Sequence, residues 1–197
     1  MFVSFEGIDG SGKTTQAELL ARWLRAQGRE VVATREPGGT PLGEQVRSIL
    51  LGDEDISAWA EAALFAAARA ELVERVIAPA VAAGSDVVSD RYIDSSLAYQ
   101  GIARSLGVDA VLELNLHATR GLLPDRTILV LVDPETAIGR SSPSDRIERQ
   151  SAGFHRTVDS AYRSLAQRFP DRIAVIGGDG PPEQVAEEVR GHIRDLS

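Results

Sequence analysis

Residues 7–14 read Gly7-Ile8-Asp9-Gly10-Ser11-Gly12-Lys13-Thr14 and follow the apolar run Phe2-Val3-Ser4-Phe5. The glycines let the backbone curl, so that successive N–H groups point into one concavity that binds anionic oxygens. Lys13 adds a positive charge that can reach the outer phosphates, and the hydroxyl of Thr14 suits a magnesium ion. A helix beginning here turns the positive end of its dipole toward the same anions. The stretch therefore predicts a strand, a phosphate-binding loop and a helix.

Short apolar stretches alternate along the chain with longer segments of helical periodicity. The expected strands are Phe2–Glu6, Val31–Thr34, Asp86–Ser89, Thr127–Val132 and Ile173–Ile176, and the expected helices are Lys13–Gln27, Ser57–Ala83, Asp109–Ala118, Ser151–Phe169 and Pro182–Leu196. Such short apolar strands are typical of strands buried on both faces. The alternation predicts an α/β protein with the three-layer P-loop NTPase fold, a parallel five-stranded sheet flanked by helices. Ligands of such sheets bind beyond the carboxyl ends of the strands.

The long Ala-rich segment 57–83 carries its own signals. Ser57 can cap the start of a helix, with Glu61 nearby to favour the positive end of the dipole. Pro79 predicts a kink or a break near the end.

Composition narrows the class of protein. The 197 residues fit one domain spanning 1–197, and the absence of cysteine excludes disulfides and thiolate metal sites. The net charge of −8 disfavours a broad nucleic-acid groove. No apolar stretch approaches the ~20 residues that span a bilayer, and no basic-then-apolar signal begins the chain. We expect a cytoplasmic protein with no nucleic-acid or membrane partner.

A second set of motifs follows the next predicted strands. Asp90, after Val87-Val88-Ser89, is expected to organise magnesium together with Thr14, and Arg91 can hold a phosphate in a bidentate contact. The alternative is a solvated Asp-Arg pair at a strand end. The Pro- and Gly-rich loop 34–41 is expected to form one wall of a small-molecule pocket, with a plain surface turn as the alternative.

Three further groups of residues leave two interpretations open. Phe65 and Arg69 are four residues apart on a helix, which suits a flat polar base, although a core ring and a solvated arginine are the commoner arrangement. The segment 95–101, Ser-Ser-Leu-Ala-Tyr-Gln-Gly, can read the edge of a substrate, or its serines can cap a helix. A short lid at about 140–150 can close over the transferring phosphates, or its charges form a solvated face; its arginines are Arg140, Arg146 and Arg149.

Taken together, these segments resemble the thymidylate kinase family, from residue 2 to about residue 196. The motifs are, in order, Phe5–Thr15, Thr34-Arg35-Glu36-Pro37-Gly38-Gly39-Thr40, Asp90-Arg91-Tyr92 with Ser95–Gly101, and Asp145-Arg146-Ile147-Glu148. The first is general to P-loop proteins apart from Glu6 and Asp9, whereas the second and third are specific to this family. The resemblance implies phosphorylation of dTMP to dTDP with MgATP, on the route to dTTP.

The resemblance also implies residue roles. ATP is expected at the P-loop residues Gly7, Ile8, Asp9, Gly10, Ser11, Gly12, Lys13, Thr14 and Thr15, with Arg140, and magnesium at Thr14 and Asp90. The expected dTMP site comprises Asp9 near the sugar 3′-hydroxyl, the loop residues Glu36 and Pro37, Phe65 stacked on thymine, Arg69 near the base, Arg91 on the phosphate, Ser96 and Gln100 on base or sugar, and Tyr99 against the 2′ position. The expected catalytic residues are Lys13, Asp9, Arg91 and Arg146. With this resemblance, the functional interpretation of Phe65 and Arg69 becomes the favoured one.

One feature departs from the family pattern. Members with glycine at the position of Gly10 supply catalytic arginines from the lid, yet here Ser141-Ser142-Pro143-Ser144 stands where basic residues are expected. Among the arginines that remain, Arg146 is the one expected to reach the transferring group.

Two alternatives stay open: a P-loop kinase of another nucleoside monophosphate, and a weakly active nucleotide-binding module. The family is commonly homodimeric, and the Ser57–Ala83 helix with Trp59 can supply an interface or pack internally.

Overall fold

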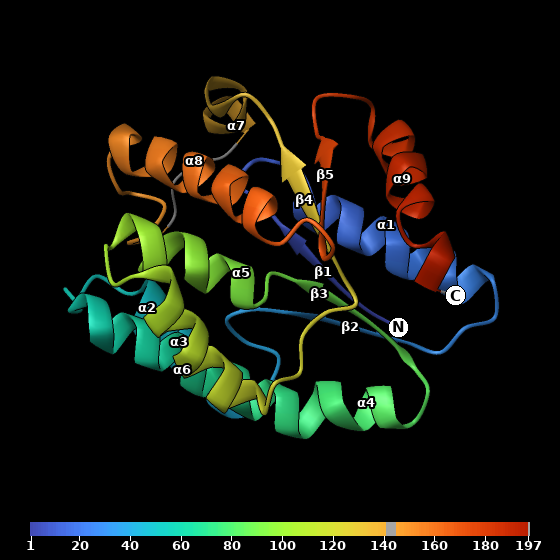
Figure 1. Ribbon diagram of the computed structural model, residues 1–197, viewed down its shortest axis with the longest axis horizontal. Coiled ribbons are helices and arrows are strands. Elements are labelled where there is room, and N and C mark those ends of the chain that lie inside the picture. The colour runs from blue at the N-terminus through green and yellow to red at the C-terminus, as the bar shows by residue number, and fades with distance from the viewer. Residues whose placement is uncertain (141–144, 197) are drawn as a thin grey trace.

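A sheet of parallel strands forms the centre of the protein (Figure 1). The computed structural model describes residues 1–140 and 145–196, and within them five strands pair in the order β2-β3-β1-β4-β5. The strands are β1 (Phe2–Glu6), β2 (Val31–Arg35), β3 (Asp86–Asp90), β4 (Arg126–Leu131) and β5 (Ile173–Gly177). The central β1 divides β2 and β3 from β4 and β5, so the strand order reverses there and opens a crevice at the carboxyl ends. The predicted three-layer fold is confirmed.

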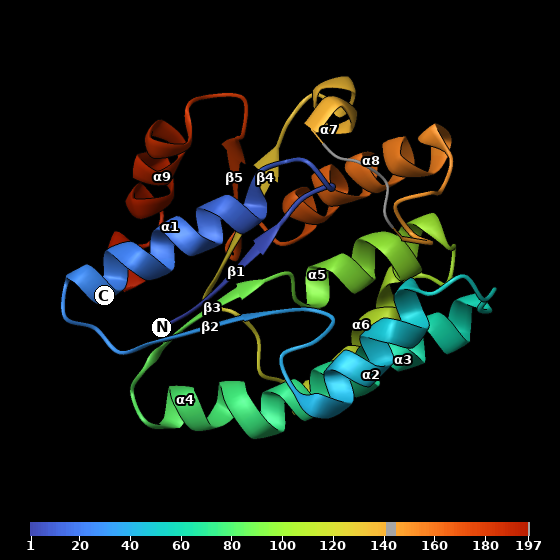
Figure 2. The same ribbon diagram turned by 180° about the vertical axis from the view of Figure 1, so that it is seen from behind.

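Helices cover both faces of this sheet (Figures 1 and 2). One face packs against α1 (Lys13–Ala26) and α9 (Pro182–Gly191). The other face packs against three helical stretches: α4 (Ala78–Ala82) with the π-helix Val73–Ile77, α5 (Ile93–Ser96) with the π-helix Leu97–Ala103, and α8 (Ala152–Arg168). The remaining helical elements are α2 (Pro41–Leu51), α3 (Ala58–Leu72), α6 (Val108–Thr119), α7 (Pro134–Arg140) and the 3₁₀ turn Arg194–Leu196. In the described residues, no helix is both long and apolar enough to cross a membrane.

The side chains of β1 divide between the two faces because successive residues of a strand point in opposite directions. Val3 and Phe5 pack among the residues of α1 and α9. Phe2 packs with the α4 side of the sheet, and the Ser4 hydroxyl lies 2.9 Å from that of Thr127. Glu6 ends the same row, so its carboxylate reaches the carboxyl-end crevice on the α5 and α8 side.

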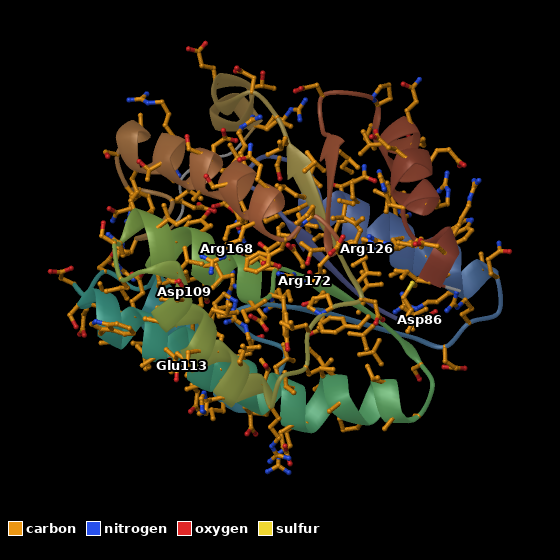
Figure 3. All side chains as sticks on the ribbon, viewed as in Figure 1. Asp86, Asp109, Glu113, Arg126, Arg168 and Arg172 are labelled. Carbon is orange, nitrogen blue, oxygen red and sulfur yellow. The ribbon has the colours of Figure 1, made fainter. Side chains whose placement is uncertain are left out.

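Polar contacts, one part-buried and one exposed, join elements on this second face (Figure 3). Arg172, just before β5, donates to both carboxylate oxygens of Asp94 on α5, at 2.5 and 2.7 Å, and also donates to Thr127 at 2.9 Å. Arg168 at the end of α8 donates to Asp109 at the start of α6. These contacts tie α5 to the segment before β5, and α8 to α6.

The structure corrects three expectations about these elements. The edge strands β2 and β5 are only partly buried, because each has a neighbour on one side alone. The long helical segment is continuous but widens into a π-helix at Val73–Ile77, and Pro79 lies in the first turn of α4, where its missing N–H is tolerated. The segment 41–51, to which no helix or strand was assigned from the sequence, is the helix α2.

The expected helix caps are also corrected. Ser57 precedes α3, but its side chain makes no capping hydrogen bond. Tyr92 is the N-cap residue of α5, so Ser95 and Ser96 lie inside that helix, and their hydroxyls contact side chains of the site and not the helix start.

Candidate active site

The loop between β1 and α1 has the backbone that its glycines predict. Gly7 and Gly12 have φ angles of +145° and +91°, and α1 begins directly after Gly12. A side chain at Gly7 would lie 2.5 Å from the carbonyl oxygen of Val130 on β4, so the loop must pass close to this strand. The sequence thereby places the amides of the loop and the start of α1 around one concavity.

An open cavity of about 960 Å³ lies over this loop. Its residues come from the loop, the start of α1, β4, α7, the segment between β5 and α9, and α9 itself: Gly10, Ser11, Gly12, Lys13, Thr14, Thr15, Gln16, Val130, Arg140, Gly178, Gly180, Pro182 and Val185. Arg140 at the end of α7 donates to the carbonyl of Gly178 at 3.1 Å, which brings a second positive charge to the cavity. A polyanion with a flat group suits this combination of amides, cations and small residues.

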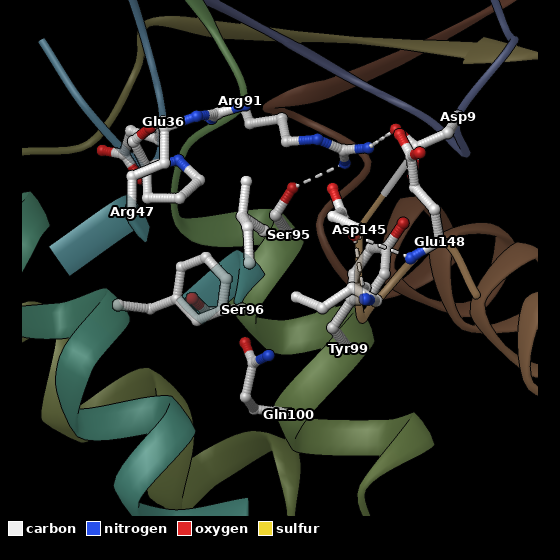
Figure 4. A pocket seen from close by; sticks show the side chains of 14 residues that line it. Asp9, Glu36, Arg47, Arg91, Ser95, Ser96, Tyr99, Gln100, Asp145 and Glu148 are labelled. Atoms are coloured by element: carbon white, nitrogen blue, oxygen red, sulfur yellow. Dashed lines mark hydrogen bonds and ion pairs between the residues drawn. The ribbon is translucent and has the colours of Figure 1, made fainter. Parts of the chain in front are cut away.

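Asp9 joins two cations at the edge of the loop. Its Oδ1 accepts a hydrogen bond from Lys13 Nζ at 2.9 Å and from Arg91 Nη2 at 2.5 Å (Figure 4 shows the second). Burial acts to raise the pKa of Asp9, but the charges of Arg91 and Lys13 outweigh it and hold that pKa well below the ordinary value. The pKa of Lys13 is lowered by its own burial and by Arg91.

Thr14 and Asp90 meet beside the loop, as expected from their positions after β1 and at the end of β3. The Thr14 hydroxyl donates to Asp90 Oδ2 at 2.6 Å. The other carboxylate oxygen, Oδ1, is buried without a hydrogen-bond partner among the described residues. An unpartnered carboxylate oxygen next to a hydroxyl fits the oxygen ligands and retained waters that magnesium prefers. The two residues are therefore able to hold this ion, directly or through water.

Arg91 is aimed by a strained turn after β3. Its φ angle is +71°, a left-handed conformation that costs free energy for residues other than glycine. Its N–H donates to the carbonyl of Phe5 at 2.9 Å, which anchors the turn to β1. Its guanidinium donates to Ser95 Oγ at 3.0 Å and to the Tyr162 hydroxyl at 3.1 Å. The turn and these contacts direct the guanidinium toward Asp9 and away from the sheet.

Glu6, at the end of β1, holds the side chains that contact Arg91. Its carboxylate is buried and accepts hydrogen bonds from the N–H groups of Tyr92 and Ser95 at 2.8 and 3.1 Å, and from the hydroxyls of Ser95 and Tyr162 at 2.6 and 2.8 Å. Burial, followed by the charge of Asp94, raises the pKa of Glu6 to about 7, against the lowering effect of Arg91. The carboxylate thus organises the start of α5 and the two hydroxyls that contact Arg91.

A second cavity, of about 560 Å³, opens on the other side of Asp9 (Figure 4). It is lined by residues of the loop, α2, α3, α5, the following π-helix and the 145–148 segment: Asp9, Glu36, Pro37, Arg47, Leu51, Phe65, Arg91, Ser95, Ser96, Tyr99, Gln100, Asp145, Ile147 and Glu148. Arg91 and Arg47 lie on one side of the cavity and the amide of Gln100 lies on the opposite side, and the ring of Phe65 also lines the cavity (Figure 4). A small molecule with a phosphate at one end and an aromatic ring at the other suits this distribution.

Arg69 lies behind the wall of this cavity and not in it. Its side chain is 1% exposed and donates to Glu36 Oε2 at 2.7 Å, to Ser96 Oγ at 3.0 Å and to the carbonyl of Tyr92 at 3.0 Å, and it also donates to Asn115 Oδ1. The pKa of Glu36 is raised by burial against the lowering effect of Arg69. Arg69 therefore fixes two residues that line the cavity.

Glu61 of α3 lies behind Gln100, which lines the cavity. Glu61 is 1% exposed and accepts a hydrogen bond from Gln100 Nε2 at 2.9 Å and from Arg146 Nη2 at 2.7 Å. Arg104 lies 3.4 Å from the same carboxylate. Arg146 also donates twice to the carbonyl of Leu50 on α2, at 3.1 and 3.2 Å.

The chain is similar in sequence and in structure to known thymidylate kinases. The sequence pattern of the family described as thymidylate kinase matches residues 5–189. A thymidylate kinase of Symbiobacterium thermophilum is 45% identical over 200 residues, which cover 100% of this chain and 94% of that protein. One of Leifsonia xyli subsp. xyli is 48% identical over 195 residues, covering 96% and 92%. The crystal structure of thymidylate kinase from Ehrlichia chaffeensis superposes with a TM-score of 0.82 at 34% identity and covers 98% of each chain.

The chain belongs to the thymidylate kinase family. The two cavities meet at the consecutive residues Asp9 and Gly10, of which Asp9 lines the second cavity and Gly10 lines the first.

Most of the predicted site residues lie at these two cavities. The predicted dTMP residues Asp9, Glu36, Pro37, Phe65, Arg91, Ser96, Tyr99 and Gln100 all line the second cavity, and the predicted P-loop residues from Gly10 to Thr15, with Arg140, line the first. Asp90 contacts Thr14 at the edge of the first. Within the described residues, Arg146 lines neither cavity, and its guanidinium is held by Glu61 and Leu50. The predicted Ser141–Ser144 part of the lid lies outside the described residues.

Several residues at the site were not predicted from the sequence. Arg47 comes from α2, which was not expected as a helix. The Thr-Pro pair before it was the signal in the sequence for a helix that would carry it. Tyr162 of α8 contacts Arg91, 71 residues away in the chain, and Glu6, 156 residues away. Glu61 was assigned only to the helix dipole. A carboxylate among alanines on a buried helix face was the signal that it has a partner inside.

Proposed function

We propose that this protein transfers the γ-phosphoryl group of ATP to the 5′-phosphate of dTMP, giving dTDP and ADP. One observation carries the proposal: Asp9 holds Lys13 of the donor loop and Arg91 of the second cavity on one carboxylate oxygen. Two phosphate-binding cations are thereby placed at the junction of two cavities, one over a P-loop and one ending in an aromatic ring. A donor and an acceptor polyanion can meet end to end only at such a junction.

Each group at the junction has a part in this reaction. The loop amides and Lys13 bind the donor phosphates, and Arg91 turns an acceptor phosphate oxygen toward the donor. Phe65 stacks on the thymine ring, and Tyr99 crowds the sugar. No general base is required, because a phosphate dianion is already nucleophilic at neutral pH. The protein contributes position and positive charge, which are the main sources of catalysis in phosphoryl transfer.

Magnesium is part of the proposal. Thr14 and Asp90 would hold it, since a hydroxyl and an unpartnered carboxylate oxygen lie together there. When bound, the ion neutralises charge on the donor phosphates.

A catalytic role for Arg146 stays a prediction, because its guanidinium would first have to exchange Glu61 and Leu50 for phosphate. Arg140 is the lid-side arginine that already lines the donor cavity. We also propose that the protein is cytoplasmic and forms a homodimer. The exposed apolar side chains of Trp59, Ile49 and Leu42 on α2 and α3 support the homodimer.

A coupled ADP-release assay tests this function directly. ATP and magnesium are supplied with dTMP, dUMP, dGMP, dCMP or AMP in parallel. We expect dTMP to give the highest kcat/KM, with dUMP next because it lacks only the methyl group. Preference for a purine monophosphate would indicate another nucleoside monophosphate kinase. Binding of ATP without product from any of the five would indicate a nucleotide-binding module.

A further inference from the structure

The amide of Gln100 has a fixed orientation at the base end of the acceptor cavity. Gln100 lies on the π-helix Leu97–Ala103, and its amide points into the cavity (Figure 4). Its Nε2 donates to Glu61 Oε1 at 2.9 Å. An ionised carboxylate only accepts hydrogen bonds, so it must face the NH₂ group of the amide. The carbonyl oxygen Oε1 is then the atom that Gln100 presents to a ligand.

Glu61 is kept ionised by its other partners. Arg146 donates to Oε2 at 2.7 Å, and Arg104 lies 3.4 Å from the same oxygen. Burial acts to raise the pKa of Glu61, but hydrogen bonds from Gln100 and Arg146 and the charge of Arg104 outweigh it, so the pKa lies below its ordinary value. Glu61 is 1% exposed and lies between two arginines, so protonation of its carboxylate would leave both cations without a charged partner. The ionised form is therefore the favoured one.

Ser96 has a complementary polarity for the same kind of reason. Its Oγ accepts from Arg69 Nη1 at 3.0 Å, and a guanidinium can only donate. The hydroxyl hydrogen of Ser96 is then directed elsewhere, and Ser96 lines the cavity on the same helical stretch as Gln100. The base end of the cavity thus offers one acceptor, Gln100 Oε1, and one donor, the Ser96 hydroxyl.

This pattern distinguishes the pyrimidine bases. Thymine and uracil carry an N3–H donor beside a carbonyl acceptor, whereas cytosine carries an N3 lone pair beside an amino donor. An acceptor fixed on Gln100 attracts N3–H and repels a lone pair. Building on the proposed function, we propose that Glu61 is a positioning residue that selects thymine and uracil over cytosine by fixing the orientation of the Gln100 amide. Arg146 and Arg104 act in turn by holding Glu61.

The variant Glu61→Gln tests this selection. The amide that replaces the carboxylate can present either its oxygen or its NH₂ group, so the Gln100 amide is free to turn in both directions. We expect the ratio of kcat/KM for dTMP to that for dCMP to fall by about 10- to 100-fold, with dUMP following dTMP. The change should lie mainly in KM for dTMP, and the inhibition constant of dCMP against dTMP should decrease. The matched control is Glu71→Gln, a more exposed carboxylate of the same helix whose ion pair with Arg75 lies outside both cavities.

A second variant covers the case in which Glu61→Gln does not fold. Arg146→Met removes one donor from Glu61 and reaches Gln100 only through it, so the same ratio should fall several-fold. Equal losses for dTMP and dCMP in either variant, with the ratio unchanged, would overturn the selection role. A loss confined to kcat in Arg146→Met would assign Arg146 to the phosphates instead. If the wild-type protein forms no dTDP at all, the proposed function fails, which is distinct from failure of this inference.

Discussion

At the residue scale, the junction between the cavities depends on how Asp9 shares one oxygen between two cations. Lys13 and Arg91 both lie on Oδ1, at 2.9 and 2.5 Å. Two cations that are buried close together need an anion between them, and Asp9 is that anion when no nucleotide phosphate is bound. Phosphate oxygens on both sides can then take over these donors, so the ion pairs hold the two cations in place before either nucleotide binds.

Arg91 should therefore matter for transfer far more than for donor binding. In Arg91→Ala we expect kcat/KM for dTMP to fall by about 10² or more, since a charge-stabilising contact is lost. The Kd of ATP, measured by calorimetry, should change by less than about threefold. Arg75→Ala, which removes an exposed arginine of the π-helix before α4, serves as the control. Equal loss of ATP binding and dTMP phosphorylation would contradict the acceptor role of Arg91.

Glu6 should make stability depend on pH. Its pKa of about 7 in the folded protein lies above the ordinary value of 4.5, so its contribution to stability is complete below pH 4.5 and is lost as the pH rises through 7. Between about pH 5 and about pH 8, the free energy of unfolding of the wild type should fall relative to that of Glu6→Gln. Urea unfolding at several pH values measures this difference. Curves that run parallel, as expected for Glu183→Gln on the exposed side of α9, would show that Glu6 stays charged throughout.

Residues close together in sequence were predictable, and those joined by folding were not. The P-loop, Asp90-Arg91 and the 95–101 segment are contiguous motifs whose chemistry follows from their spacing. The contact of Gln100 with Glu61 spans 39 residues and that of Tyr162 with Glu6 spans 156. Pairs of this kind depend on which helix faces pack together, and one sequence does not state that.

At the element scale, α2 shows how a short signal sets one wall of the acceptor cavity. Thr40 Oγ1 accepts from the N–H of Gly43 at 2.9 Å, and Pro41 occupies the first turn, where its missing N–H costs nothing. The helix carries Arg47, which donates to the carbonyl of Pro37 at 2.9 Å and lines the cavity. The Thr-Pro pair that begins this helix can be recognised in the sequence, although both residues were assigned to the loop 34–41.

Removing this cap should weaken α2 measurably. We expect Thr40→Ala to lower the free energy of unfolding by about 1 kcal/mol, because the N–H of Gly43 loses its partner. Thr40→Ser keeps the hydroxyl and should lose less than half as much. Chemical denaturation with a fixed m-value measures both. If the serine variant is as unstable as the alanine variant, packing of the threonine methyl and not the cap holds the helix.

At the scale of the whole molecule, three of the five large apolar side chains that are exposed in the described residues lie on α2 and α3. Leu42 and Ile49 are seven residues apart on α2 and so share a face, and Trp59 near the start of α3 is 51% exposed. Large exposed apolar side chains grouped in this way favour association.

The homodimer prediction has a matched pair of variants. Trp59→Glu places a charge in the expected interface and should reduce the mass measured by sedimentation from that of a dimer to that of a monomer. Val81→Glu changes another exposed apolar residue, 37% exposed on α4, and should leave the dimer intact. A wild-type protein that sediments as a monomer at all concentrations would contradict the prediction.

The measurement that tests the central claim most directly is a crystal structure with dTMP and a non-hydrolysable ATP analogue bound together. We predict that the thymine ring lies against Phe65, that the dTMP phosphate is held by Arg91, and that the terminal phosphate of the analogue lies at Lys13, facing that phosphate across Asp9. A complex in which thymine lies away from Phe65, or in which Arg91 contacts no phosphate, would contradict the account.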